Sequence, residues 1–239
     1  MTATTDPAVD ILHLLRVKGQ ASEEALAAHT GLGRPVIEMQ LALLADERLV
    51  GRRDGTQAAW SLTDDGRVAH AERCSAQLTG AGRRESIAEA NQLFLPVNDG
   101  LLAACTAWQL RPVGGRDIPN DHTDGRYDAA VIARLHDLHG AARPICGRLA
   151  ATLARYGGYW DRLTTALRRV DAGECEWFTS PRLDSYHTAW FELHEDLLVT
   201  LGIPRSGRTS SSSSARPGQD ADTAPDSSEA AQAYSCRER

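Results

Sequence analysis

The spacing of apolar residues in the first third of the chain predicts four short helices and a pair of strands. Three of the helices come first, and Ile37, Leu41 and Leu44 form the buried stripe of the third, over about 34–47. The pattern then alternates over about 58–62, as in a half-buried strand, before helical spacing returns. The four helices are expected to begin at or just after Asp6-Pro7, Ser22, Arg34 and Thr63.

The second half of the chain has helical spacing almost throughout. Pro96 predicts a kink or a break in its first long apolar stretch, and Pro144 predicts a bend in the second. Residues 112–125 are rich in Pro, Gly, Asp and Asn, which indicates an ordered loop. We expect the last helix to begin at Ser180-Pro181 and to end at Gly202.

The segment from Leu26 to Gly66 has the features of a helix-turn-helix followed by a wing. Ala27 allows two helices to approach closely, Gly31 can adopt the left-handed turn between them, and Ile37 would fill the seam. Asp54-Gly55, between the two strand segments, is a strong pair for a tight hairpin. Together these features predict a winged helix.

This segment resembles the winged-helix DNA-binding domain of MarR-type bacterial regulators, including the Ser-Leu-Thr-x-x-Gly-Arg motif at residues 61–67. Three later segments look like the helical half of an actinobacterial group of that superfamily: 106–111, 120–122 and 190–198. The pattern and the resemblance predict a mainly α protein with an N-terminal winged helix-turn-helix and a small β-wing. The expected divisions are a winged-helix domain over 1–83, an all-helical domain over 84–204 and a disordered, Ser-rich tail over 205–239.

The charge of the chain limits how it could bind DNA, and its cysteine content indicates the cellular compartment. The net charge is −6, and residues 1–83 carry nine Lys and Arg against eleven Asp and Glu, so any DNA-binding face must be a local basic patch. The chain has no apolar run long enough to span a bilayer and no signal peptide, so we expect no membrane contact. Its five cysteines include no CxxC pair, which favours reduced thiols in a cytoplasmic protein.

Candidate DNA-binding residues lie on the third helix and on the predicted wing. Arg34 could bind guanine bidentately or bind a phosphate, and Glu38 could accept a hydrogen bond from cytosine. Met39 offers only apolar contact. Arg52 and Arg53 are adjacent on the wing, where they could bind phosphates or reach a minor groove. The alternative is a winged helix that binds a partner protein, with these arginines exposed to solvent.

Two pairs of histidines in the helical half are candidates for metal ligands. His187 and His194 are seven residues apart, or about 10 Å along a helix at ~1.5 Å per residue, whereas each zinc–nitrogen bond is only ~2.1 Å long. His136 and His139 are one turn apart and could share an ion with a group from 121–122, but surface or hydrogen-bonded histidines explain them more simply. We therefore predict no metal.

The aromatic residues of the helical half are best explained as core, although some could line a ligand pocket. The polar residues that could close such a pocket are Arg111, Asn120, Asp121, His122, Tyr186, His187 and His194. We expect the 120–122 loop to dock against His187 and His194 if that pocket exists. The acidic residues at 192, 195 and 196 are expected to form a solvated face.

No enzyme motif is evident, since the sequence has no Walker loop, GxGxxG, GxSxG or zinc-protease helix. We therefore expect a DNA-binding transcriptional regulator, not an enzyme, with double-stranded DNA as its partner and no cofactor. It should form a homodimer, because two half-sites give specificity that one helix does not. The helical domain would supply the dimer interface and possible room for a small-molecule effector. Two alternatives remain: a winged-helix protein-interaction module, and a small-molecule-binding helical protein or enzyme.

Overall fold

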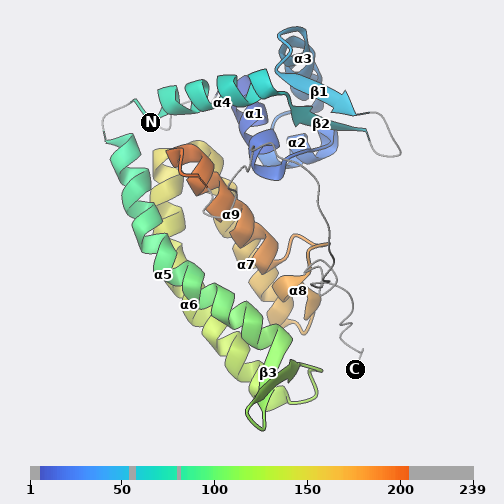
Figure 1. The fold of residues 1–239 in the computed structure, drawn as a ribbon, viewed down its shortest axis with the longest axis vertical. Coiled ribbons are helices and arrows are strands. Elements are labelled where there is room, and N and C mark those ends of the chain that lie inside the picture. Colours follow the sequence, from blue (N-terminus) through green and yellow to red (C-terminus); the bar gives the residue numbers. More distant parts are fainter. Residues whose placement is uncertain (1–5, 54–57, 80–81, 205–239) are drawn as a thin grey trace, which may run out of the picture.

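The computed structural model describes residues 6–53, 58–79 and 82–204 and is mainly helical (Figure 1). In chain order its elements are α1 (Pro7–Lys18), α2 (Glu23–Thr30), α3 (Arg34–Asp46), β1 (Val50–Arg53), β2 (Ala59–Leu62), α4 (Asp64–Gln77), α5 (Arg83–Gln109), β3 (Leu110–Val113), β4 (Arg116–Pro119), α6 (Gly125–Thr152), the 3-10 helix η1 (Ala154–Tyr156), α7 (Gly157–Asp171), α8 (Glu176–Thr179) and α9 (Tyr186–Leu201). No helix within these described ranges is both long and apolar enough to cross a membrane.

The elements α1–α4 with β1 and β2 form what we call the N-terminal unit. Gly31 ends α2 with a φ of 68°, the left-handed conformation expected of it. Ile37 is completely buried, as predicted, and α3 packs on α1, α2 and β1. The two strands pair antiparallel, and Ala21 adds a bridge to Trp60 at the edge of this sheet. The predicted hairpin pair Asp54-Gly55 lies outside the described residues.

The connection from the sheet to α4 explains the Thr-x-x-Gly spacing in the sequence. The Thr63 hydroxyl accepts a hydrogen bond from the backbone of Gly66, 2.9 Å away, and donates to the carbonyl of Arg48. The backbone of Leu49 passes so close to Gly66 that an added Cβ would lie 1.9 Å from its carbonyl oxygen. Glycine is therefore required by close packing of backbone against backbone, and not by an unusual φ.

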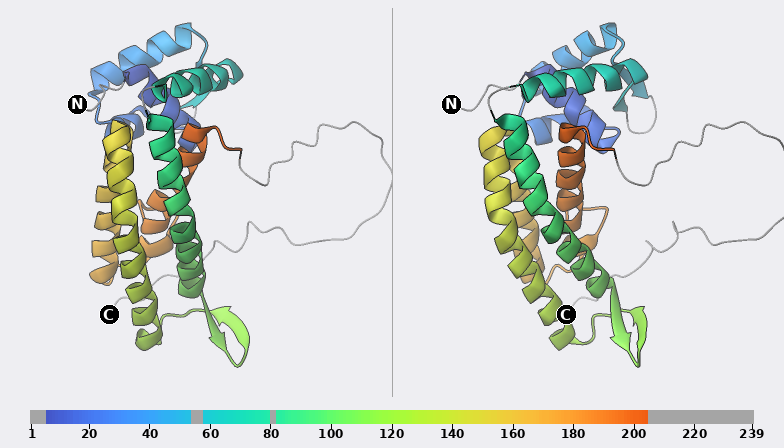
Figure 2. Two further views of the ribbon diagram at one scale, coloured as in Figure 1. Left: turned by 90° about the vertical axis from the view of Figure 1, so that its left-hand side faces the viewer. Right: turned by 60° about the vertical axis from the view of Figure 1, so that its left-hand side comes forward.

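The elements α5–α9 form what we call the helical unit, in which α5 and α6 run side by side over most of their length (Figure 2). Helix α5 continues through Pro96, so the expected break does not occur. Proline costs the helix one hydrogen bond, but Phe94 and Leu101 on either side are buried in the core. This packing holds the two halves of the helix together across the proline.

Two other predictions for the second half were wrong. Residues 112–119, within the ordered loop expected over 112–125, belong to the antiparallel hairpin β3–β4, whose turn has Gly114 and Gly115 at positive φ. Helix α9 begins at Tyr186 and not at Ser180-Pro181, because Ser185 supplies the N-cap and accepts from the backbone of Thr188 at 3.2 Å. The predicted tail over 205–239 lies outside the described residues.

The N-terminal unit covers one end of the helical unit, above the start of α5 and the end of α9 (Figure 1). Each unit has its own hydrophobic cluster of buried residues. Between the clusters, α1 and α4 contact α9 through buried polar side chains. The two cores are therefore separated by a polar layer.

Two glycine-to-alanine substitutions should have opposite effects on the free energy of unfolding. Gly66→Ala forces the backbone of Leu49 to move, so we expect a loss of at least about 3 kcal/mol. Gly147→Ala, at an open position of α6, should instead add about 0.5–1 kcal/mol, because alanine has the higher helix propensity. Urea unfolding measures both. A Gly66→Ala protein as stable as the wild type would show that the close approach is incorrect.

Candidate functional site

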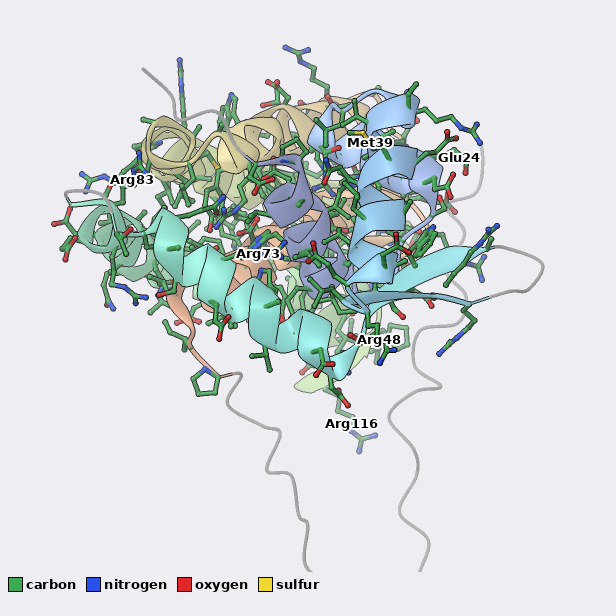
Figure 3. All side chains as sticks on the ribbon, turned by 90° about the horizontal axis from the view of Figure 1, so that it is seen from above. Glu24, Met39, Arg48, Arg73, Arg83 and Arg116 are labelled. Carbon is green, nitrogen blue, oxygen red and sulfur yellow. The ribbon has the colours of Figure 1, made fainter. Side chains whose placement is uncertain are left out.

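The outer face of α3 is the first candidate site. Gly33 and Pro35 begin this helix, and its buried stripe turns the opposite face to solvent. That exposed face bears the residues Arg34, Pro35, Glu38, Met39, Ala42 and Leu43. Figure 3 shows Met39 on α3 and Arg48 near the point where α3 leads into the hairpin. The helical unit does not cover α3, which packs within the N-terminal unit.

The two residues expected to contact bases are paired with each other. Arg34 Nε donates to Glu38 Oε1 at 2.8 Å, and Arg34 Nη2 lies 4.0 Å from Glu23 Oε2. The Arg34 side chain is nevertheless 67% exposed, so its guanidinium group is accessible. Next to this pair the face is apolar, since Met39 and Leu43 are 53% and 51% exposed.

Arginines also gather at the hairpin beside α3. Arg52 and Arg53 are exposed at the end of β1, where they pair with Trp60 and Ala59 of β2. Arg48 is exposed just before β1 and has a positive φ of 59°, at the junction of α3 with the sheet. The backbone of Trp60 forms hydrogen bonds of 2.8 and 3.0 Å with the backbone of Ala21, which attach β2 to the segment between α1 and α2. A local basic group therefore flanks the exposed face of α3.

Four of the predicted pocket residues meet at the start of α6, where most of them bond to their neighbours. Asn120 is buried and donates through Nδ2 to the Trp108 carbonyl at 3.1 Å and to Asp128 Oδ1 at 2.8 Å. Nδ1 of His122 lies 3.1 Å from Asp128 Oδ2, and its ring lies at a tilt against Trp108, with 4.4 Å between the ring centroids. Arg111 lies within 4 Å of carboxylate oxygens of Asp121 and Asp124. These contacts fix the connection between β4 and α6, so the four residues have a structural role here.

The other three predicted pocket residues lie on α9 and contact different partners. The Tyr186 hydroxyl is 3.3 Å from His139 Nδ1, His187 stacks on Phe191, and His194 lies against Phe94. The 120–122 loop contacts Trp108 of α5, Arg111 of β3 and Asp128 of α6, whereas His194 lies against Phe94, fourteen residues before Trp108 on α5, so the expected docking against His194 is wrong. The loop instead satisfies its polar groups locally, beside Trp108.

His136 and His139 also have separate partners. His136 Nε2 lies 2.8 Å from Asp171, and the ring of His139 stacks on Trp160.

A second candidate site, which was not predicted from the sequence, is a buried cluster that we call the polar junction: His13, His70, Cys74, Arg155 and Asp196. These residues come from α1, α4, η1 and α9, and the Asp196 residue is only 3% exposed. Asp196 Oδ1 lies 2.8 Å from His13 Nε2 and 3.7 Å from Arg155 Nε. Tyr159 donates to Asp196 Oδ2 at 3.1 Å. The prediction of a solvated face at Asp196 was therefore wrong.

The charges of the polar junction shift the pKa of several groups. Burial alone would raise the pKa of Asp196, but the charges of His13 and Arg155 outweigh burial and hold it well below its usual range. Burial and the neighbouring cation of His13 lower the pKa of His70 to about 3. The carboxylate of Asp196 is thus ionised at neutral pH, and the imidazole of His70 is neutral.

Two sequence signals point to this junction in retrospect. His13 interrupts the apolar stripe of α1 between Leu12 and Leu15, and it is as buried as they are. His70 and Cys74 are four residues apart on α4, so they share one helix face. No local signal connects either feature to Asp196, which is 183 residues from His13 along the chain.

Comparisons of this chain with protein-family models, with curated proteins and with solved structures gave no match.

Asp10, on α1 beside the polar junction, should make stability depend on pH. Burial raises the pKa of Asp10 from 3.8 to about 6, although Arg155 and His13 oppose this shift. A folded-state pKa above the unfolded value stabilises the fold below about pH 4, and this stabilisation is lost as pH rises through 6. Compared with Asp10→Asn, the wild type should lose about 2 kcal/mol of unfolding free energy between pH 4 and pH 7.

Urea unfolding of both proteins across this pH range makes the measurement, because all other titrating groups are common to both. Asp137→Asn, at an exposed position of α6, controls for the change in net charge. A constant difference between wild type and Asp10→Asn would show that Asp10 titrates normally in the folded protein.

Proposed function

We propose that the protein is a DNA-binding transcriptional regulator and that its N-terminal unit is a winged helix. The order of three helices, a β-hairpin and a fourth helix supports this assignment, as does the left-handed Gly31 between α2 and α3. In this arrangement α3 is the helix that would enter the major groove, and the β1–β2 hairpin is the wing.

The observation that carries the proposal is the exposure of α3 beside an arginine-bearing hairpin. A helix must be accessible along one whole face to enter a groove, and no element of the helical unit packs on α3 in the way that α1 and α2 do. Arg52 and Arg53 would bind phosphates on the flanking backbone. Because the chain as a whole is negatively charged, these arginines would determine which face of the protein approaches the DNA.

The ion pair on α3 is compatible with DNA binding. Arg34 and Glu38 are both exposed, and an exposed pair one helical turn apart contributes only about 0.3–0.5 kcal/mol. A phosphate or a guanine could therefore displace Glu38 from Arg34 at little cost. The released Glu38 could accept from cytosine, and Met39 could contact a thymine methyl group.

Two copies of the chain would be needed to recognise an operator, because one helix contacts only a few base pairs. The helical unit offers exposed apolar side chains for a second copy on α5, where Leu95 and Leu102 are seven residues apart on one face. We propose that these leucines contribute to a homodimer.

A second candidate function is binding of a partner protein through α3. The exposed Met39 and Leu43 favour it, because apolar side chains add little to DNA affinity but much to protein interfaces. In this case the Arg34–Glu38 pair would stay intact at the rim of the contact.

Salt-dependent binding to duplex DNA of arbitrary sequence tests the first function. Arg52→Ala combined with Arg53→Ala removes two phosphate contacts, so the slope of log K against log salt should become shallower by about 1.8. The matched control is Arg143→Ala combined with Arg168→Ala, two exposed arginines of the helical unit, which should leave the slope unchanged. Equal effects of the two pairs would contradict the proposal. Negligible binding of the wild type at low salt would contradict it too, and would favour the partner protein.

A further inference from the structure

Three potential metal ligands meet inside the polar junction. His13 Nδ1 lies 3.0 Å from His70 Nε2 and 4.0 Å from Cys74 Sγ, and all three ligand atoms lie within 4.8 Å of one another. Each of the three residues is at most 3% exposed. Among the described residues, this is the group of histidine, cysteine and acidic side chains that converges closely enough to hold an ion.

The two separations measured from His13 are close to those between ligands of a tetrahedral zinc site, in which these three residues would leave one position open. Zinc–nitrogen bonds of about 2.0–2.1 Å and zinc–sulfur bonds of about 2.3 Å place neighbouring ligand atoms about 3.3–3.6 Å apart. The distances from His13 to the other two atoms lie a few tenths of an ångström below and above this range, so small side-chain rotations would complete the geometry. His70 and Cys74 are one helical turn apart on α4, which points both toward α1.

Asp196 orients the first ligand. Its Oδ1 atom accepts from Nε2 of His13 at 2.8 Å, so Nε2 keeps its proton and Nδ1 is the nitrogen that would release a proton to bind a metal ion beside His70 and Cys74. The carboxylate is itself fixed by hydrogen bonds from Tyr159 and Thr200. A carboxylate behind a ligating histidine is the usual support of a protein zinc site.

The contact of Cys74 with Arg155 also suits a metal ligand. Arg155 Nη2 donates to Cys74 Sγ at 3.6 Å, a contact that favours the thiolate form of the ligand. Mixed imidazole and thiolate ligation favours zinc over calcium or magnesium.

We propose that His13, His70 and Cys74 bind one zinc ion. The ion links α1 to α4 at the surface where both helices pack on α9. This site is independent of DNA binding, because none of its ligands lies on α3 or on the hairpin.

Cobalt substitution of the full chain, treated with a chelator and then titrated with cobalt(II) alone, tests the site. Cobalt bound by a thiolate gives a sulfur-to-metal charge-transfer band in the near ultraviolet. We expect this band to saturate at one cobalt per chain, to be lost in Cys74→Ser and to persist in Cys175→Ser, the matched cysteine control on the helical unit. Added zinc should displace the cobalt and remove the band.

A second measurement covers the case in which Cys74→Ser does not fold. X-ray absorption at the zinc edge of the wild-type protein should show one sulfur at about 2.3 Å and two or more nitrogen or oxygen ligands at about 2.0–2.1 Å. His70→Ala, which leaves the thiol in place, should reduce the cobalt affinity at least tenfold while the circular dichroism spectrum stays unchanged. Absence of a charge-transfer band in the wild type, or an unchanged band in Cys74→Ser, would show that the cluster is held by hydrogen bonds alone.

Discussion

The carboxylate of Asp196 is ionised and almost completely enclosed, and a charge in that position must be paired. An uncompensated buried charge costs several kcal/mol, so the folded chain must bring cationic and hydrogen-bonding groups to it. His13 arrives from α1, Arg155 from η1 and Tyr159 from α7, each from a different element. These partners are useful only if α1 lies against α9 in one orientation. The arrangement of the N-terminal unit on the helical unit follows from this requirement.

Further ion pairs extend the same contact toward solvent. Lys18 at the end of α1 pairs with Glu192 of α9, and Arg16 lies 3.9 Å from Glu195. These outer pairs add little stability individually, but they oppose any rotation of α1 on α9. Because α3 packs on α1, the same contacts determine the direction in which the exposed face of α3 points. Directional hydrogen bonds and ion pairs fix α1 in one orientation on α9, whereas a purely apolar contact would allow the two helices to slide along each other.

The features that could be predicted from the sequence were those with local causes. Gly31 at a helix end, Ile37 on an apolar stripe and Thr63 at a helix start act on neighbours within a few residues, and the structure places each as expected. Failures arose where another residue supplied the helix cap, as Ser185 does for α9, or where a local signal was overlooked, as in the two-glycine turn at 114–115.

The polar junction could not be predicted, because its residues are separated by most of the chain. Asp196 follows the spacing of a solvated helix face until α1 covers it, and Cys74 is one of several isolated cysteines in the sequence. For α3, the apolar stripe in the sequence correctly predicted which residues are exposed. The pairing of Arg34 with Glu38 was not predicted, because it depends on side-chain conformation.

Scanning calorimetry of the intact wild-type protein tests most directly whether the buried charges join the two units. If they do, the N-terminal unit and the helical unit should unfold in one transition whose calorimetric and van't Hoff enthalpies agree. Two separate transitions, with the smaller enthalpy belonging to the N-terminal unit, would contradict this account.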